Sequence, residues 1–344
     1  MQPVLPPPDA QPDFDNLLAV LQKQCPARPT LFEFILNEPL FNKVTEPATD
    51  APAELAARVR TIRAFAALGY DHAMMFPPFG FAPAHETLET CSINDGIISD
   101  RATFEAFHWP DPDQLDYSWL DRLAPFLPGT MKLIVFTPNG VLENAISLVG
   151  YESLCFMILD DEQLVFDLFE TIGTILCSYH RNCLKHEAVG GVIGNDDWGF
   201  KSQTMLSPED MRRFVFPWHK RIVDIAHEAG RPAILHSCGN LAEVMDDVID
   251  TMRYDGKHSY EDTIQPVEEA YDTYHHRIAI LGGIDVDFLC RSTPEQIYER
   301  AKGMIQRSAE NGAYALGTGN SVPEYVPDDA YFAMIRAINE TRGE

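Results

Sequence analysis

Short apolar runs alternate with longer amphipathic stretches along most of the chain. Apolar residues at positions i, i+3 and i+4 predict helices over residues 55–68, 161–180, 208–229 and 294–310. Two of these begin with a capping residue followed by proline, at Ser207-Pro208 and Thr293-Pro294. The short apolar runs predict eight strands, over residues 31–36, 71–76, 132–136, 190–193, 232–235, 252–255, 278–281 and 313–316.

Regular alternation of strand and helix predicts parallel pairing with right-handed crossovers, and eight such units close a barrel. A dinucleotide-binding sheet would need GxGxxG after its first strand, where this chain has LNEPLFN. We therefore expect an α/β fold, a single (β/α)8 TIM barrel over residues 29–344 with an N-terminal extension over residues 1–28. The Pro- and aromatic-rich residues 77–128, after the second strand, are expected to form a lid over the barrel mouth.

The net charge of the chain limits the kinds of molecule that it can bind. Lys and Arg number 26 against 52 Asp and Glu, which gives a net charge of -26 and repels phosphate backbones and anionic membranes. Neither nucleic acid nor a membrane is expected as a partner, and a polyanionic substrate is disfavoured. The start of the chain lacks the pattern of a signal peptide, and its seven cysteines lack CxxC spacing. These features predict a cytoplasmic protein with free thiols.

Polar residues collect directly after the predicted strands, at the end of the barrel where active sites form. Six segments contribute them: TPNG, NDDW, HSCGN, HSYED, GGID and GTGNS. Aromatic residues in and near these segments could line a pocket, although most aromatic residues in a protein belong to the core. The residues expected to bind substrate are Phe79, Asn139, Asn195, Trp198, His258 and Asp285.

His236 and Cys238 suggest a metal site. Residues two apart at a strand end point the same way, and both imidazole and thiolate are good zinc ligands. Glu261, after the next strand, is the carboxylate placed best to be the third ligand of a catalytic zinc. The alternatives are a buried histidine beside an inert cysteine, and a solvated or ion-paired glutamate.

The adjacent acids Asp196 and Asp197 are the candidate catalytic residues. They could act as a general base, bind a polar edge of the substrate, or hold a zinc-bound group in place. The alternative is an Asx turn that caps the following helix.

The motifs NDDWGFKSQTMLSPEDMRRFVFPWHKRIV and ILHSCGN, followed by GGIDVDFL and GTGNSVP, resemble the uroporphyrinogen decarboxylase superfamily from about residue 31 to residue 338. Within it, they look like the branch of corrinoid-dependent methyltransferases. The resemblance to the decarboxylase itself is poor, because LFEFILNEP and HAMMFPPFG stand where its Arg-rich segment and catalytic Asp would be.

The resemblance implies Zn²⁺ bound by His236 and Cys238, and a corrinoid (cobalamin) carried by a separate corrinoid protein. That branch has a further Cys near the last strand, where this chain has Asn320. The ligand set is thereby left open: Glu261 could be a permanent ligand, Asn320 a weak ligand or a neighbour of the ligands, or the metal could be lost.

Three functions follow. The preferred one is a zinc-dependent methyltransferase that moves a methyl group between a small substrate and the corrinoid, in the demethylating direction. Its substrate would be a methoxylated or methylated compound, or a thiol. The alternative enzyme is a decarboxylase-like lyase acting on a small carboxylate or a porphyrinogen, with Asp196 or Asp197 as acid and base and no metal. The third is a corrinoid- or tetrapyrrole-binding module without turnover.

Overall fold

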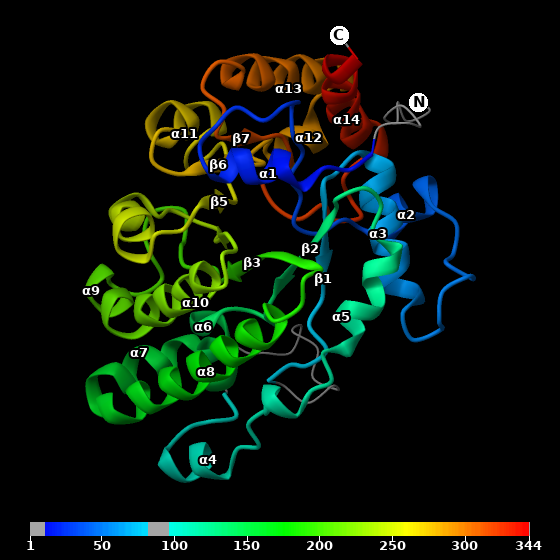
Figure 1. Cartoon of the computed structure of the whole chain (residues 1–344). Helices are drawn as coiled ribbons and strands as arrows, with labels where there is room; N and C mark the ends of the chain where they lie inside the picture. The colour runs from blue at the N-terminus through cyan, green and yellow to red at the C-terminus, as the bar shows by residue number, and fades with distance from the viewer. Residues whose placement is uncertain (1–10, 82–95, 344) are drawn as a thin grey trace.

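A computed structural model describes residues 11–81 and 96–343 of the chain. Its seven strands form one parallel sheet in which every strand lies beside the next in sequence, as the barrel prediction requires (Figure 1). The strands are β1 (His72–Met75), β2 (Lys132–Phe136), β3 (Val189–Asn195), β4 (Ala233–His236), β5 (Gly256–His258), β6 (Ala279–Leu281) and β7 (Tyr314–Ala315).

The predicted first strand, residues 31–36, takes the eighth position without forming a regular strand. On one side it makes isolated parallel bridges at Leu31–Leu316 and Leu36–Val322, and on the other the Glu33 carbonyl accepts a hydrogen bond from His72 of β1. The ladder is broken because the Thr318 N–H is bonded to the Glu33 carboxylate at 3.1 Å. The segment therefore closes the barrel, although the prediction of a continuous strand was wrong.

The prediction of a strand at residues 252–255 was also wrong, by a few residues. Met252 ends a π-helical segment, η6 (Asp247–Met252), and Arg253 then adopts a left-handed conformation with φ 65°. The strand starts only at Gly256. This shift moves Lys257 and His258 from the expected loop into the wall of the barrel, where both are buried.

The four predicted helices are confirmed in position. Residues 208–229 contain a π-helical segment, η4 (Met211–Val215), between two α-helices. Among the described residues no single helix is long and apolar enough to cross a membrane, and only the bent pair of α6 and α7 passes that test when counted together. The α-helices are α1 (Phe14–Leu21), α2 (Glu38–Val44), α3 (Ala56–Leu68), α4 (Arg101–Ala106), α5 (Ser118–Leu123), α6 (Val141–Val149), α7 (Tyr151–Asp160), α8 (Glu162–Cys183), α9 (Pro208–Asp210), α10 (Phe216–Glu228), α11 (Val267–Tyr274), α12 (Val286–Arg291), α13 (Pro294–Ser308) and α14 (Asp328–Gly343).

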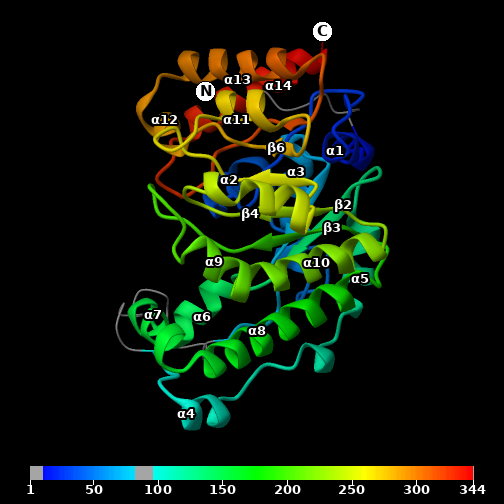
Figure 2. The same ribbon diagram turned by 90° about the vertical axis from the view of Figure 1, so that its left-hand side faces the viewer.

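The expected lid, residues 77–128, lies elsewhere as far as it is described. Residues 82–95 lie outside the described part of the chain. Residues 96–128 include α4 and α5 and run along the outside of α8, where Arg101 pairs with Asp167 at 2.6 Å and Asp113 accepts bonds from Ser178 and Asn182. Both views place α4 at the outer edge of the molecule, beyond α8 (Figures 1 and 2). This part takes the place of a crossover helix and does not cover the mouth.

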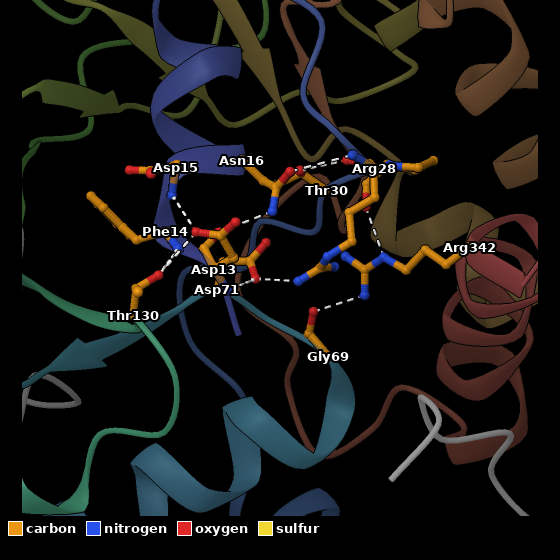
Figure 3. A network of polar contacts seen from close by, with 11 residues as sticks. Asp13, Phe14, Asp15, Asn16, Arg28, Thr30, Gly69, Asp71, Thr130 and Arg342 are labelled. Carbon is orange, nitrogen blue, oxygen red and sulfur yellow. Dashed lines mark hydrogen bonds and ion pairs between the residues drawn. The ribbon is translucent and has the colours of Figure 1, made fainter. Parts of the chain in front are cut away.

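The described part of the N-terminal extension belongs to the barrel core. Helix α1 buries Leu17, Val20 and Leu21, the pattern of one apolar face against the strand N-termini. Asp71, at the start of β1, accepts a hydrogen bond from the Asp13 N–H at 2.7 Å and pairs with Arg28 (Figure 3). These contacts tie the extension to the closed end of the barrel.

Candidate metal centre

The ends of β3 and β4 bring three potential metal ligands together. Asn195 and His236 are direct neighbours in the sheet, so the residues that follow them leave the barrel wall side by side. One ligand atom from each of Asp197, His236 and Cys238 lies within 4.8 Å of the other two. Three donors at this spacing can bind one ion from one side.

The hydrogen bonds of His236 fix which of its nitrogens is free. The Thr318 carbonyl can only accept, so the proton of His258 sits on Nε2, which lies 3.1 Å from that oxygen. Burial lowers the pKa of His258 to about 3, so His258 is neutral and its Nδ1 is an acceptor. His236 therefore donates from its own Nδ1 to His258 Nδ1 at 2.7 Å. This leaves the lone pair on His236 Nε2 available to a metal.

The other two donors hold each other in place. The Cys238 N–H donates to one carboxylate oxygen of Asp197 at 2.8 Å. Burial, followed by the nearby Asp197 charge, raises the pKa of the Cys238 thiol to about 12. Without a cation the sulfur is therefore protonated at neutral pH, and a bound metal would have to displace that proton.

This donor set fits zinc. A neutral imidazole, a thiolate and a carboxylate are three protein ligands of the kinds found in catalytic zinc sites, and they leave a fourth position for a substrate atom. The second nitrogen of the histidine is bonded to a neighbouring group, as is usual for metal-bound histidines. His258, expected to bind substrate, instead lies buried behind His236 and orients it.

Glu261, the expected third ligand, is not part of this cluster. The structure groups Asp197 with the His-Cys pair, while Glu261 lines a neighbouring cavity with Lys257 and Ser259. The difference follows from geometry: Asp197 lies two residues beyond β3, close to the strand end, whereas Glu261 lies three residues beyond β5.

Asn320 lies beside the sulfur without presenting its oxygen to it. The side-chain amide donates to Cys238 Sγ at 3.2 Å, and its oxygen accepts from the Ser321 N–H at 2.7 Å. This bonding assigns nitrogen to the sulfur side. Of the two expected roles, weak ligand and neighbour of the ligands, the geometry corresponds to the second.

The carboxylate of Asp196 is held by hydrogen bonds to other parts of the fold. It is fully buried, and its oxygens accept hydrogen bonds from the N–H groups of Leu142 and Glu143 at the start of α6, both at 2.9 Å. His219 Nε2 lies 2.9 Å from the same carboxylate, and Tyr254 holds the other nitrogen of that ring. With both oxygens engaged, Asp196 caps the start of α6, a helix earlier in the chain, and not the following helix that the Asx-turn alternative named.

Four of the residues expected to bind substrate have other surroundings. Trp198 is completely buried against Phe216 and His219. The Phe79 ring packs on Tyr179 of α8. The other two residues hold loop backbone in place. Asp285 caps α12 and accepts the Asp262 N–H, and Asn139 lies in a left-handed turn (φ 60°) whose carbonyl accepts from the Thr137 hydroxyl.

Asn195 remains close to the cluster. It is the sheet partner of His236, and its buried side-chain oxygen has no hydrogen-bond partner among the described residues. A buried oxygen of this kind is costly unless a ligand, ion or water satisfies it. Asn195 thus keeps its place as a candidate for substrate binding.

Two features near the cluster were not foreseen. Phe34 packs on His236 with ring centroids 4.3 Å apart, and Phe136 packs on Phe34 at 4.9 Å, which gives the histidine an apolar flank. Phe76, half exposed, extends this flank toward solvent. The other feature is the buried Lys257. Every second residue of a strand faces the inside of the barrel, and this pattern could have indicated the aromatic residues. Lys257 could not be found in this way, because the strand predicted at residues 252–255 placed it in a loop.

Comparison with known proteins identifies the family of the chain. The family model described as uroporphyrinogen decarboxylase (URO-D) matches residues 42–341, most of the sequence. The chain belongs to this family. The methylated-thiol–coenzyme M methyltransferase of Methanosarcina mazei is 30% identical over 141 residues, which are 41% of this chain and 35% of that protein. The chain thus matches about a third of the length of that relative.

Solved structures agree with the family fold. A methyltransferase from Methanosarcina mazei superposes with a TM-score of 0.72 at 16% identity, over 94% of this chain and 97% of that one. A Listeria monocytogenes protein, described provisionally as a vitamin-B12-independent methionine synthase, superposes with a TM-score of 0.50 at 12% identity, over 92% and 98% of the two chains. At these identities the likeness shows that this member of the uroporphyrinogen decarboxylase family shares their barrel fold.

Proposed function

We propose that this member of the uroporphyrinogen decarboxylase family is a zinc-dependent methyltransferase that moves a methyl group between a small substrate and a corrinoid on a separate protein. The observation that carries the proposal is the convergence of Asp197, His236 and Cys238, together with the hydrogen bond from His236 Nδ1 to His258 that leaves His236 Nε2 free. Similarity over 141 residues to a methyltransferase that acts on methylated thiols supports it.

Different residues of the chain would bind the metal, withdraw charge from one of its ligands and exclude water. Asp197, His236 and Cys238 would hold the zinc, which when bound supplies a Lewis acid for the heteroatom that carries the methyl group. The Asn320 amide donates to the Cys238 sulfur and so withdraws charge from that ligand. Phe34 and Phe136 would keep water away from one side of the site.

The demethylating direction balances as follows. The bond between the methyl carbon and its heteroatom breaks with both electrons left on the heteroatom, which then takes a proton from solvent. The methyl group would pass to the cobalt(I) corrinoid of the separate protein, a co-substrate that would supply the electron pair of the new bond. A single thiolate ligand, in place of the two that the resemblance implies for the branch, leaves the metal less electron-rich and therefore a better acceptor for the heteroatom.

The geometry disfavours a lyase that uses Asp196 and a lyase that acts on a tetrapyrrole. A lyase that used Asp196 as acid and base would need that carboxylate free, whereas both its oxygens accept hydrogen bonds from the start of α6. The cavity beside the cluster is lined by one basic residue, Lys257, among its described residues, whereas a tetrapyrrole with many carboxylates needs several.

Metal analysis combined with a transfer assay tests the proposal. Purified protein should contain about one zinc per chain, and His236→Ala should lose both the zinc and the transfer of methyl groups to cob(I)alamin from a panel of methoxylated and methylated donors. His227→Ala is the matched control, because His227 lies on α10 and pairs with Asp255 away from the cluster. Full zinc retention in His236→Ala, or no transfer from any donor by the zinc-loaded parent, would contradict the proposal.

A further inference from the structure

Helix α7 is apolar on most of its surface but is hardly buried. Seven of its ten residues are apolar, and within this helix Leu154 is the one buried residue. Phe156 is 59% exposed and Leu159 is 81% exposed. A helix that is apolar on most sides is normally covered by the rest of its protein or by a partner. These exposures therefore indicate that something other than the described residues covers α7.

The helix before it has no such surface. α6 and α7 meet at an angle of 94° and have similar apolar compositions, but α6 buries six of its nine residues in the core. The uncovered apolar surface thus belongs to α7. Cys155, Phe156 and Leu159 lie three and four residues apart in this helix, so they share one side of it. We call these three residues the α7 face.

The α7 face lies at the mouth of the barrel, near the metal cluster. The Tyr151 hydroxyl, at the start of α7, donates to the Met205 carbonyl at 2.6 Å, and the centroids of the Tyr151 and Phe200 rings are 5.8 Å apart. Met205 and Phe200 belong to the loop after β3 that also carries the proposed ligand Asp197. Figure 2 shows α7 at the same end of the molecule as α9 and opposite α1, which packs against the strand N-termini.

The surroundings of the α7 face carry mostly one sign of charge. Residues 141–170 contain seven Asp and Glu and no Lys or Arg. Asp160 and Asp161 follow the face directly and are exposed. Arg101 and Arg213, from other segments, each pair with one of these seven acids, so an excess of negative charge remains. Two copies of this surface would repel each other, as would an anionic membrane, whereas Lys and Arg of a partner would be attracted.

We propose that the α7 face is the docking site of the separate protein that carries the corrinoid, and that this protein meets it with an apolar surface bordered by Lys and Arg. The proposal rests on the methyltransferase function proposed above, in which a co-substrate held by another protein reaches the mouth. A protein that presents its cofactor there must contact the rim. Burial of Phe156 and Leu159 would contribute affinity, and the acids beside them would speed association.

The test uses the zinc-loaded full chain and cobalamin-loaded corrinoid proteins of the organism that makes it, with binding measured by sedimentation velocity. Phe156→Ser combined with Leu159→Ser should weaken binding at least about tenfold, because the contact loses two large apolar side chains. Zinc content and methyl transfer to free cob(I)alamin should not change. Tyr325→Ser is the matched control, since Tyr325 is 70% exposed but follows β7 instead of β2.

The expected charge of the partner has its own test. Asp160→Lys should weaken binding roughly threefold at low salt and make it less sensitive to salt, because an attraction becomes a repulsion. Glu310→Lys is the control, because it changes the charge of the chain equally at an exposed position between α13 and β7, at the closed end. Equal effects of the two substitutions would show that the overall charge of the chain, and not the α7 face, attracts the partner.

The outcomes separate this inference from the function on which it rests. Unchanged binding in the double serine variant overturns the docking site, and so does failure of every corrinoid protein to bind the parent chain. Loss of self-association in that variant would assign the face to a second copy, and loss of binding to phosphatidylcholine vesicles would assign it to a membrane. If a corrinoid protein binds through α7 but the parent transfers no methyl group to it or to free cob(I)alamin, the docking site stands and the methyltransferase proposal fails.

Discussion

The two ends of the barrel both bury charged and titratable groups, but they arrange them differently. At the closed end, Asp71 meets Arg28 and the Asp13 N–H, and Arg342 donates to backbone carbonyls (Figure 3). At the open end, one ligand atom from each of Asp197, His236 and Cys238 lies within 4.8 Å of the other two.

This contrast separates structural groups from functional ones. A buried acid that meets a base has its charge satisfied within the fold, so removing one partner destabilises the protein. Buried ligand atoms gathered within a few ångströms of one another cost free energy that a bound ligand can offset, and such clusters mark functional sites. Substituting one group of each kind tests whether the two ends differ in this way.

The largest effect is expected for Asp71→Ala at the closed end. Removing this carboxylate leaves Arg28 without its partner and Arg342 without a nearby negative charge, which should lower the free energy of unfolding by about 3 to 5 kcal/mol. Urea unfolding measures it. Asp50→Ala is the matched control, because the equally well-formed Asp50–Arg63 pair is exposed and its loss should change the free energy of unfolding far less. Equal losses in the two variants would refute the structural role of Asp71.

A pH effect of about 2 kcal/mol is expected from Glu33, which is buried with hydrogen bonds but no counter-charge. Burial raises its pKa from 4.5 to about 8, so the folded state holds a proton that the unfolded state releases above 4.5. Stability should therefore fall as pH rises from 6.5 to 8. Glu33→Gln should flatten this change in urea unfolding; the same slope in both proteins would rule Glu33 out as its source.

His258→Leu, at the open end, should weaken zinc binding roughly 10- to 100-fold, because His236 loses the acceptor that fixes its tautomer. His258→Asn can keep an acceptor near the same place and should restore part of the affinity. Competition with a chelating dye measures both. If the leucine and asparagine variants bind zinc equally weakly, the hydrogen bond is not what matters.

The smallest effect is expected for Asn320→Ala, which should keep most of the zinc, with less than about a tenfold loss of affinity, because the amide contacts the sulfur and is not a ligand. Asn320→Cys should bind zinc more tightly and transfer methyl groups to cob(I)alamin more slowly, since a second thiolate weakens the Lewis acid. Loss of zinc in the alanine variant would show that the ligand assignment is wrong. Unchanged transfer with tighter zinc in the cysteine variant would remove the argument for the demethylating direction.

The order of strands and helices, the parallel barrel and the His236–Cys238 pair can all be predicted from the sequence. These depend on periodicity and on spacing within one strand end, which are local properties of the chain. Even the two strand errors stayed local, because a short stretch such as residues 252–255, in which Met252 and Tyr254 alternate with charged residues, can end a helix as readily as it can form a strand.

Which neighbours complete the site depends on how the strands pair and on how the barrel closes. Asp197 rather than Glu261 joins the pair because the register between β3 and β4 sets Asn195 beside His236, and no pattern within either segment encodes that offset. The free nitrogen of His236 depends on a bond to His258 and, through it, on the Thr318 carbonyl, 60 residues further along the chain. Contacts across such separations arise from closure of the barrel, so the sequence could supply the ligands but not their arrangement.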